Sequence, residues 1–93
     1  MRLISNKALR QFAGRHREAE NTLQAWRVAI EKHSFRSFAE LKRMFGAVDK
    51  VGDYFVFDLG GNKYRVIAAI HFNTQTLFVR DVFTHKEYDD WRP

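Results

Sequence analysis

The first half of the chain places apolar residues at helical spacing. A short strand is predicted at Leu3 and Ile4, after which Ser5 or Asn6 can cap a helix that is expected to end at Gly14. One face of this helix carries Ala8, Leu9, Phe12 and Ala13. A second predicted helix has apolar residues spaced four, three, four and three apart, at Ala19, Leu23, Trp26, Ile30 and His33. We expect the two helices to run antiparallel and to bury these stripes together.

The pattern changes in the middle of the chain. Ser37 and Glu40 match the S-x-x-E capping pattern, which predicts a third helix that reaches Phe45 and ends at Gly46. From residue 53 onward, apolar residues alternate with polar ones, and this period of two predicts strands at 53–59, 63–72 and 76–83. The turn pairs Gly60-Gly61 and Asn73-Thr74 separate them, so we expect an antiparallel meander of three strands. The order β-α-α-(α)-β-β-β predicts an α+β fold, with the N-terminal strand and helices packed on one face of a small antiparallel sheet.

The predicted register divides the sheet into two different faces. Two-residue loops place Phe57 opposite Tyr64, Asp58 opposite Lys63, and Ile67 opposite Arg80. With Asp81 as an exception, one face is apolar and carries Phe55, Phe57, Leu59, Tyr64, Val66, Ala68, Ile70, Phe72, Leu77, Val79 and Phe83. The other face carries Tyr54, Asp58, Lys63, Arg65, His71, Phe78 and Arg80. We expect the helices to cover the apolar face and to leave the second face half open, with cations and aromatic rings.

Length and charge narrow the class of protein. The chain has 93 residues, which is one domain (1–93), and it contains no cysteine, so a disulfide framework is excluded and a cytoplasmic location is expected. No apolar run has the length of a membrane span, and no membrane partner is expected. The net charge is +5, with residues 1–50 at +6 and residues 51–93 at −1. Such an excess favours a polyanionic partner such as nucleic acid or the ribosome, although many small basic domains bind neither.

Several residues near the end of the last predicted strand suit RNA cleavage. Attack by a 2′-hydroxyl on the adjacent phosphate needs groups that move protons and cations that stabilise the charged phosphorane. His85 can act as an acid or a base near neutral pH, and Tyr88 can assist proton transfer or stack on a base. Lys63, Arg65 and Arg80 can supply fixed positive charge. We therefore expect the catalytic residues to be Lys63, Arg65, Arg80, His85 and Tyr88, and the RNA contacts to be Asn62, Lys86, His71 and Phe78.

Each candidate also has a structural alternative. Lys63 can form an ordinary cross-strand ion pair with Asp58, and His85 can be a turn residue at a helix start. Tyr88 and Trp91 can pack against the sheet edge. Arg65 and Arg80 have no acidic partner between them in the predicted register, so their replacement by alanine is expected to reduce activity without unfolding the protein. The four histidines lack H-x-x-x-H spacing, so no metal or other cofactor is expected.

Two segments of the chain resemble the HigB family of toxin–antitoxin toxins. They are GGNKYRVIA at residues 60–68 and FVRDVFTHKEYD at residues 78–89, and the likeness extends to residues 1–5 and 34–45. The resemblance implies a single RelE-like toxin domain that cleaves mRNA, usually at the ribosomal A site. It also implies a cognate helix-turn-helix antitoxin of the HigA type as a partner.

Three functions remain open on the sequence alone. The first is a metal-independent mRNA endoribonuclease toxin that acts on the translating ribosome and thereby inhibits translation and growth. The second is a ribonuclease of the same fold that cuts free RNA, and the third is a non-catalytic RNA- or ribosome-binding protein. A pure binding protein would tolerate His85→Ala, whereas an acid–base role predicts a rate loss on the order of 10² or more.

Overall fold

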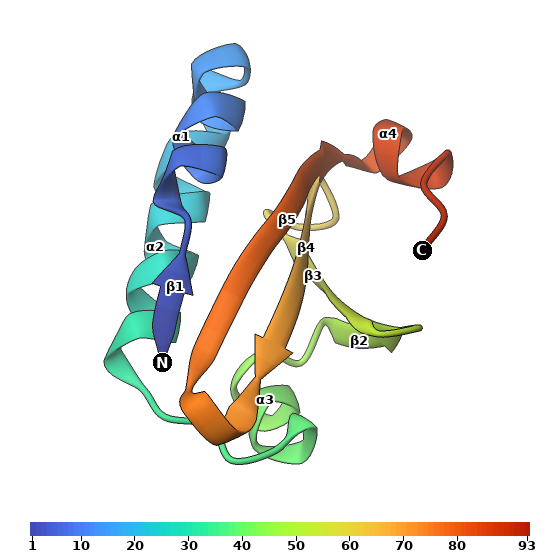
Figure 1. The fold of residues 1–93 in the computed structure, drawn as a ribbon. Coiled ribbons are helices and arrows are strands. Elements are labelled where there is room, and N and C mark those ends of the chain that lie inside the picture. Colours follow the sequence, from blue (N-terminus) through green and yellow to red (C-terminus); the bar gives the residue numbers. More distant parts are fainter.

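The computed structural model describes all residues from Met1 to Pro93. Figure 1 shows the two N-terminal helices on one side of a twisted sheet and the short C-terminal helix away from them, at the end of the last strand. The helices are α1 (Asn6–Arg15), α2 (Glu20–Lys32), α3 (Phe38–Met44) and α4 (His85–Asp89), with 3-10 turns at Arg17–Ala19 and Phe72–Thr74. The strands are β1 (Arg2–Ile4), β2 (Val48–Val51), β3 (Tyr54–Leu59), β4 (Tyr64–His71) and β5 (Thr76–Thr84). None of the helices is long and apolar enough to cross a membrane.

The sheet has more strands than the predicted meander. Its order is β1-β5-β4-β3-β2, with β1 parallel to β5 and all other neighbours antiparallel. The α+β class is confirmed, and the arrangement is consistent with a RelE-like fold. The predicted antiparallel meander is present as β3-β4-β5. The sheet is larger than that meander because the predicted N-terminal strand β1 adds a parallel edge and the unpredicted β2 adds an antiparallel one. Strand β2 escaped prediction because it has only four residues, and its exposed Asp49 and Lys50 are typical of an edge strand.

The three predicted helices begin where the sequence predicts, but α1 extends one residue further than expected, and α2 and α3 each end one residue earlier. The Ser5 hydroxyl accepts a hydrogen bond from the Lys7 N–H (3.1 Å) and caps α1, whereas Gly14 lies inside the helix, which continues to Arg15. Ser37 caps α3 by accepting from the Glu40 N–H (3.3 Å). The reciprocal half of this capping box is missing, because the Glu40 carboxylate accepts hydrogen bonds from Arg36 instead.

The hydrophobic core lies between the helices and the apolar face of the sheet. Leu23, Trp26 and Ile30 of the predicted stripe are buried, whereas His33 follows α2 and is exposed. Trp26 packs edge-on against Phe57 of β3 at 5.0 Å between ring centroids. Burial of these large side chains is the main stabilising contribution in a domain of this size.

The first hairpin has a longer turn than predicted. Leu59 pairs with Tyr64, so the loop contains four residues and Asp58 lies opposite Arg65 rather than Lys63. Because this shift is two residues, each side chain keeps its predicted face. Gly60 has a positive φ of 64°, and a Cβ there would lie 2.8 Å from the Tyr64 ring, so the turn requires glycine at this position.

The second hairpin contains a β-bulge that the alternation of apolar and polar residues did not predict. Ala68 pairs with Val79 as predicted, but Ile67 pairs with Asp81, which leaves Arg80 as the extra residue. Beyond the bulge the faces of β5 are exchanged relative to the prediction. Val82 therefore packs against the core in place of Phe83, and Asp81 moves to the second face. The bulge removes the one polar exception on the predicted apolar face.

Candidate active site at the α4 end of the sheet

Arg65 is a buried cation with many partners. It lies in β4, and only 7% of its surface is exposed. One guanidinium nitrogen, Nη1, donates to the Asp58 carboxylate at 3.0 Å and to the carbonyls of Asn62 and Tyr64. The other, Nη2, donates to the Asn62 side-chain oxygen at 2.6 Å and contacts His85. The prediction that Arg65 lies on an open face without an acidic partner is therefore wrong, because the longer turn brings Asp58 opposite it.

His85 begins α4 directly after the last strand. Its backbone N–H donates to the Lys63 carbonyl at 2.9 Å, which fixes the start of α4 against the turn before β4. Thr84 caps the helix in a complete capping box with Glu87. The T-x-x-E pattern at residues 84–87 is the sequence signal for this short helix, and the structural alternative for His85, a residue at a helix start, is observed.

The contact between Arg65 and His85 fixes the orientation of the imidazole. Nη2 of Arg65 lies 2.9 Å from Nδ1 of His85. A guanidinium has only donors, so Nδ1 must accept, and the single ring proton of this hydrogen-bonded form is on Nε2. About half of the His85 side chain is exposed (51%), and Nε2 lies 3.9 Å from the Asp89 carboxylate. The structure thus places an N–H on the Asp89 side of a half-exposed ring, at the position where the sequence predicted a proton-transfer group.

Aromatic side chains pack beside this pair. The Arg65 guanidinium lies 5.4 Å from the centroid of the Tyr88 ring, a cation–π distance. Trp91 stacks on Tyr88 at 5.7 Å and meets Tyr54 edge-on at 6.0 Å. The Tyr88 hydroxyl has no hydrogen-bond partner within the protein, whereas its ring already has two neighbours. The structural alternative for Tyr88 and Trp91, packing against the sheet, is therefore observed.

Arg80 occupies a different environment from Arg65. It is the exposed bulge residue of β5, and no acidic side chain pairs with it. Together with Ile67 and Trp91 it lines a cavity of about 140 Å³ on the second face of the sheet. Residues 91–93 border this cavity as well, so the C-terminal segment covers part of the face that we predicted to be half open.

The remaining candidates divide between the two ends of the sheet. Lys63 and Lys86 are exposed near His85 and form no ion pair, so the structural alternative for Lys63, a cross-strand ion pair with Asp58, is not observed. Asn62, predicted to contact RNA, uses its side-chain oxygen to hold Arg65. His71 and Phe78 contact each other edge-on at 5.6 Å, but His71 ends β4 whereas the His85 site lies at its start. The structure therefore does not bring His71 and Phe78 to the same site.

No group of three or more His, Cys, Asp or Glu side chains is arranged to hold a metal ion. The chemical groups in contact at this end of the sheet are an imidazole, a buried guanidinium and a phenol, and the exposed Lys63 and Lys86 lie on the adjoining backbone. Residues Asp58 and Trp91 belong to the same cluster. The sequence could have pointed to Asp58, since a carboxylate opposite an arginine on the neighbouring strand is a common cross-strand pair. Asp58 is opposite Arg65, however, only if the turn between the two strands has the correct length.

Comparison with known proteins identifies the class. Residues 19–91 match the family model for HigB toxins, described as the RelE-like toxic component of a toxin–antitoxin system. The chain is 37% identical over 92 residues to the mRNA interferase toxin HigB of Escherichia coli strain K12, covering 96% of this chain and 88% of the relative. A similar relative, the mRNA interferase HigB of Escherichia coli strain CFT073, is 29% identical over 96% of this chain and 89% of its own length.

The protein therefore belongs to the HigB family of toxins from toxin–antitoxin systems. This confirms the family resemblance noted in the sequence. The matched region contains every residue of the α4 site, from Asp58 to Trp91.

Proposed function

We propose that this protein is an endoribonuclease that cleaves mRNA on the translating ribosome and so stops translation and growth. The relatives in Escherichia coli are named mRNA interferases, and they align with almost the entire chain. The observation that carries the proposal is the half-exposed His85 ring, whose Nδ1 is held by the buried Arg65 so that the ring N–H is on Nε2. We further propose that a helix-turn-helix antitoxin of the HigA type inhibits it.

The proposed reaction is transesterification by the ribose 2′-hydroxyl. The 2′ oxygen forms a bond to phosphorus while the bond from phosphorus to the 5′ oxygen breaks. The 2′-hydroxyl loses a proton and the departing 5′ oxygen gains one, so the products are a 2′,3′-cyclic phosphate and a 5′-hydroxyl. Negative charge grows on the phosphoryl oxygens between these states, and donors at that position accelerate the reaction.

The geometry supports distinct roles for the site residues. His85 with its proton on Nε2 can donate a hydrogen bond to a phosphoryl oxygen, and the exposed Lys63 and Lys86 add positive charge nearby. Proton abstraction by Nε2 would require the ring proton to lie on Nδ1, facing the Arg65 donor. We therefore assign charge stabilisation to His85 and proton transfer to the unpartnered Tyr88 hydroxyl. Arg65 acts as a positioning residue, because its nitrogens are already occupied within the protein.

The decisive experiment maps mRNA 5′ ends after brief induction of the wild-type protein, His85→Ala and His71→Ala. His71→Ala is the matched control, because it removes an exposed imidazole at the opposite end of β4. We expect new 5′ ends with the wild type and with His71→Ala, and a loss on the order of 10²-fold or more in their rate of appearance with His85→Ala. Equal rates for all three folded proteins would overturn the assignment of the site.

Two further readouts separate the alternatives. If cleavage depends on the ribosome, blocking initiation removes the new ends, whereas a nuclease for free RNA also cuts purified message. Polynucleotide kinase should phosphorylate the new 5′ ends directly, since they carry hydroxyl groups. Ends that already carry a 5′-phosphate would show that water, rather than the 2′-hydroxyl, attacked the phosphorus atom.

A further inference from the structure

The net charge of the protein is concentrated in its first helix and the residues around it. Residues 1–17 contain five Lys or Arg residues and no Asp or Glu, whereas residues 18–93 contain eleven of each sign. The entire net charge of +5 therefore belongs to a segment that includes β1 and α1 but none of the residues of the α4 site.

The cations of this segment have no acidic partners. Lys7, Arg10, Arg15 and Arg17 are exposed, and none of them takes part in an ion pair. Glu18 and Glu20 follow closely in the sequence, yet Glu18 pairs only with His16 and Glu20 with no residue. Exposed cations without internal partners can interact with an external polyanion at no loss of existing ion pairs.

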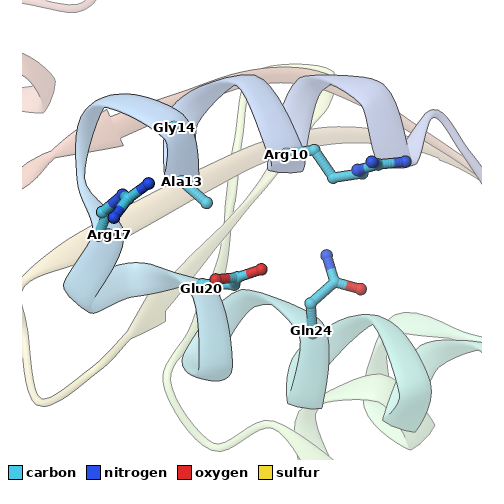
Figure 2. A pocket seen from close by; sticks show the side chains of 6 residues that line it. All are labelled: Arg10, Ala13, Gly14, Arg17, Glu20 and Gln24. Carbon is cyan, nitrogen blue, oxygen red and sulfur yellow. The ribbon is translucent and has the colours of Figure 1, made fainter.

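Three of these cations border two hollows that share Arg10. Figure 2 shows the larger hollow, of about 470 Å³, between α1 and α2. Arg10 lies on the α1 side, Glu20 and Gln24 lie on the α2 side, and Arg17 lies on the turn that joins the two helices. Gly14 of α1 also lines it, and a Cβ at this position would meet nothing within 4 Å. The second hollow, of about 390 Å³, is lined by Asn6, Lys7, Arg10 and Gln11. Helices α1 and α2 and the turn between them form a helical hairpin, and we call Lys7, Arg10 and Arg17 the hairpin cations.

We propose that the hairpin cations bind the phosphate backbone of double-stranded RNA. The walls of both hollows are polar, with Ala13 as the one apolar lining residue, so the surface does not suit an apolar peptide segment. Single-stranded RNA is held by exposed aromatic rings, and the one aromatic ring in α1, Phe12, is 1% exposed. Duplex RNA is bound through its phosphates and shape, for which cations without aromatic rings suffice.

This surface goes beyond the proposed cleavage function because it shares no residue with the α4 site. A toxin that carries it can attach to a structured RNA with one surface and act on a single strand with the other. Glu20 is the one carboxylate that faces the hairpin cations across the hollow, so its charge should oppose binding.

Binding to a fluorescent RNA hairpin with a long duplex stem, measured by anisotropy, tests the proposal. All proteins carry His85→Ala so that the RNA is not cut, which makes the result independent of cleavage. We expect the triple variant Lys7→Gln, Arg10→Gln, Arg17→Gln to bind at least about tenfold more weakly than its parent. A plot of the logarithm of the binding constant against the logarithm of the salt concentration has a negative slope. The magnitude of this slope should be smaller by about two to three for the triple variant, the value for the loss of three phosphate contacts.

The matched control removes the same charge elsewhere, through Lys32→Gln, Arg43→Gln and Lys50→Gln, which are all exposed and outside α1. This control should bind almost as tightly as the parent, and Glu20→Gln should bind more tightly. Thermal melting confirms that each variant is folded. Equal weakening by both triple variants would show that only the total charge matters and would overturn the proposal. Unchanged binding of the RNA duplex by the hairpin variant would also overturn the proposal. The same holds if that variant keeps duplex binding and instead loses binding to an antitoxin.

Discussion

Arginines occur in two contrasting environments in this protein. At the α4 end of the sheet, Arg65 is buried and donates hydrogen bonds to Asp58, Asn62 and backbone carbonyls. On the helical hairpin of α1 and α2, Arg10 and Arg17 are exposed and form no ion pair. The same side chain therefore organises a site in one region and remains available to a ligand in the other.

The difference has an energetic consequence. Removing one member of a buried, hydrogen-bonded charge pair leaves the other member without a partner, and this destabilises a folded protein substantially. Removing an exposed, unpaired cation changes stability little. Stability and activity measurements on matched substitutions can therefore distinguish an arginine that positions other groups from one that contacts RNA.

The largest expected stability effect is that of Arg65→Ala compared with Arg10→Ala. We expect Arg65→Ala to lower the free energy of unfolding by about 2–3 kcal/mol, because Asp58 and Asn62 lose their donor. Arg10→Ala should change it by no more than about 0.5 kcal/mol. Urea denaturation followed by circular dichroism measures both values.

Arg65→Lys is the control for charge, since lysine cannot reproduce the two-nitrogen fork that spans Asp58 and His85. We expect it to recover part of the stability but not the orientation of His85. If Arg65→Ala unfolds at the same urea concentration as the wild type, the buried pair is not a stabilising element and the contrast between the two regions fails.

Glycines provide a second, smaller comparison between the two regions. Gly60, in the turn that precedes Arg65, combines a positive φ with a Cβ clash against Tyr64, so Gly60→Ala should destabilise the protein by about 2 kcal/mol or more. Gly14, in α1, has open space around its Cβ, and Gly14→Ala should stabilise the protein by about 0.5–1 kcal/mol. Thermal melting of the two variants should shift in opposite directions.

Gly61→Ala separates the two causes at the turn, because Gly61 has a positive φ but no neighbour within 4 Å. It should destabilise the protein by about 1 kcal/mol, less than Gly60→Ala. Equal losses at both positions would mean that the Tyr64 contact contributes nothing.

The fold followed from the sequence wherever one pattern extended over many residues. The stripe of α2 and the alternation of β3 and β4 each place several large side chains on one side, so their faces were predicted correctly. The errors come from single residues. The bulge at Arg80 exchanges the faces of the end of β5, and nothing in the local sequence marks the extra residue apart from the misplaced Asp81.

The site was predicted less well than the fold, for a related reason. The segment from residue 84 to 91 pointed to His85 and Tyr88, and the structure brings both to Arg65. The partner of Arg65, however, depends on the length of one turn, and a two-residue loop assigned Asp58 to Lys63 instead. Alternation along a strand does not fix turn length, because a shift of two residues preserves both faces.

Tyr64 is the residue at which the two regions meet. It begins β4 beside Arg65, its ring lies under Gly60, and it packs edge-on against Phe12 of α1 at 5.9 Å. Burial raises the pKa of the Tyr64 phenol above its ordinary value of 10.0, and the negative charge of Glu18, in the turn between α1 and α2, raises it further. The folded protein therefore holds the phenol proton more tightly than the unfolded chain does.

The pH dependence of stability measures this coupling and is the smallest effect that we predict. Because the pKa is higher in the folded state, the stabilising contribution of the neutral phenol is complete below about pH 10 and is lost as the pH rises through the folded-state pKa. Urea denaturation between about pH 9 and pH 11 should show that the free energy of unfolding falls more steeply with pH for the wild type than for Tyr64→Phe, since the other groups titrate equally in both proteins. Glu18→Gln should lie between them, because burial still raises the pKa after the carboxylate is removed. Parallel losses in the wild type and Tyr64→Phe would show that Tyr64 does not connect the hairpin energetically to the strand that carries Arg65.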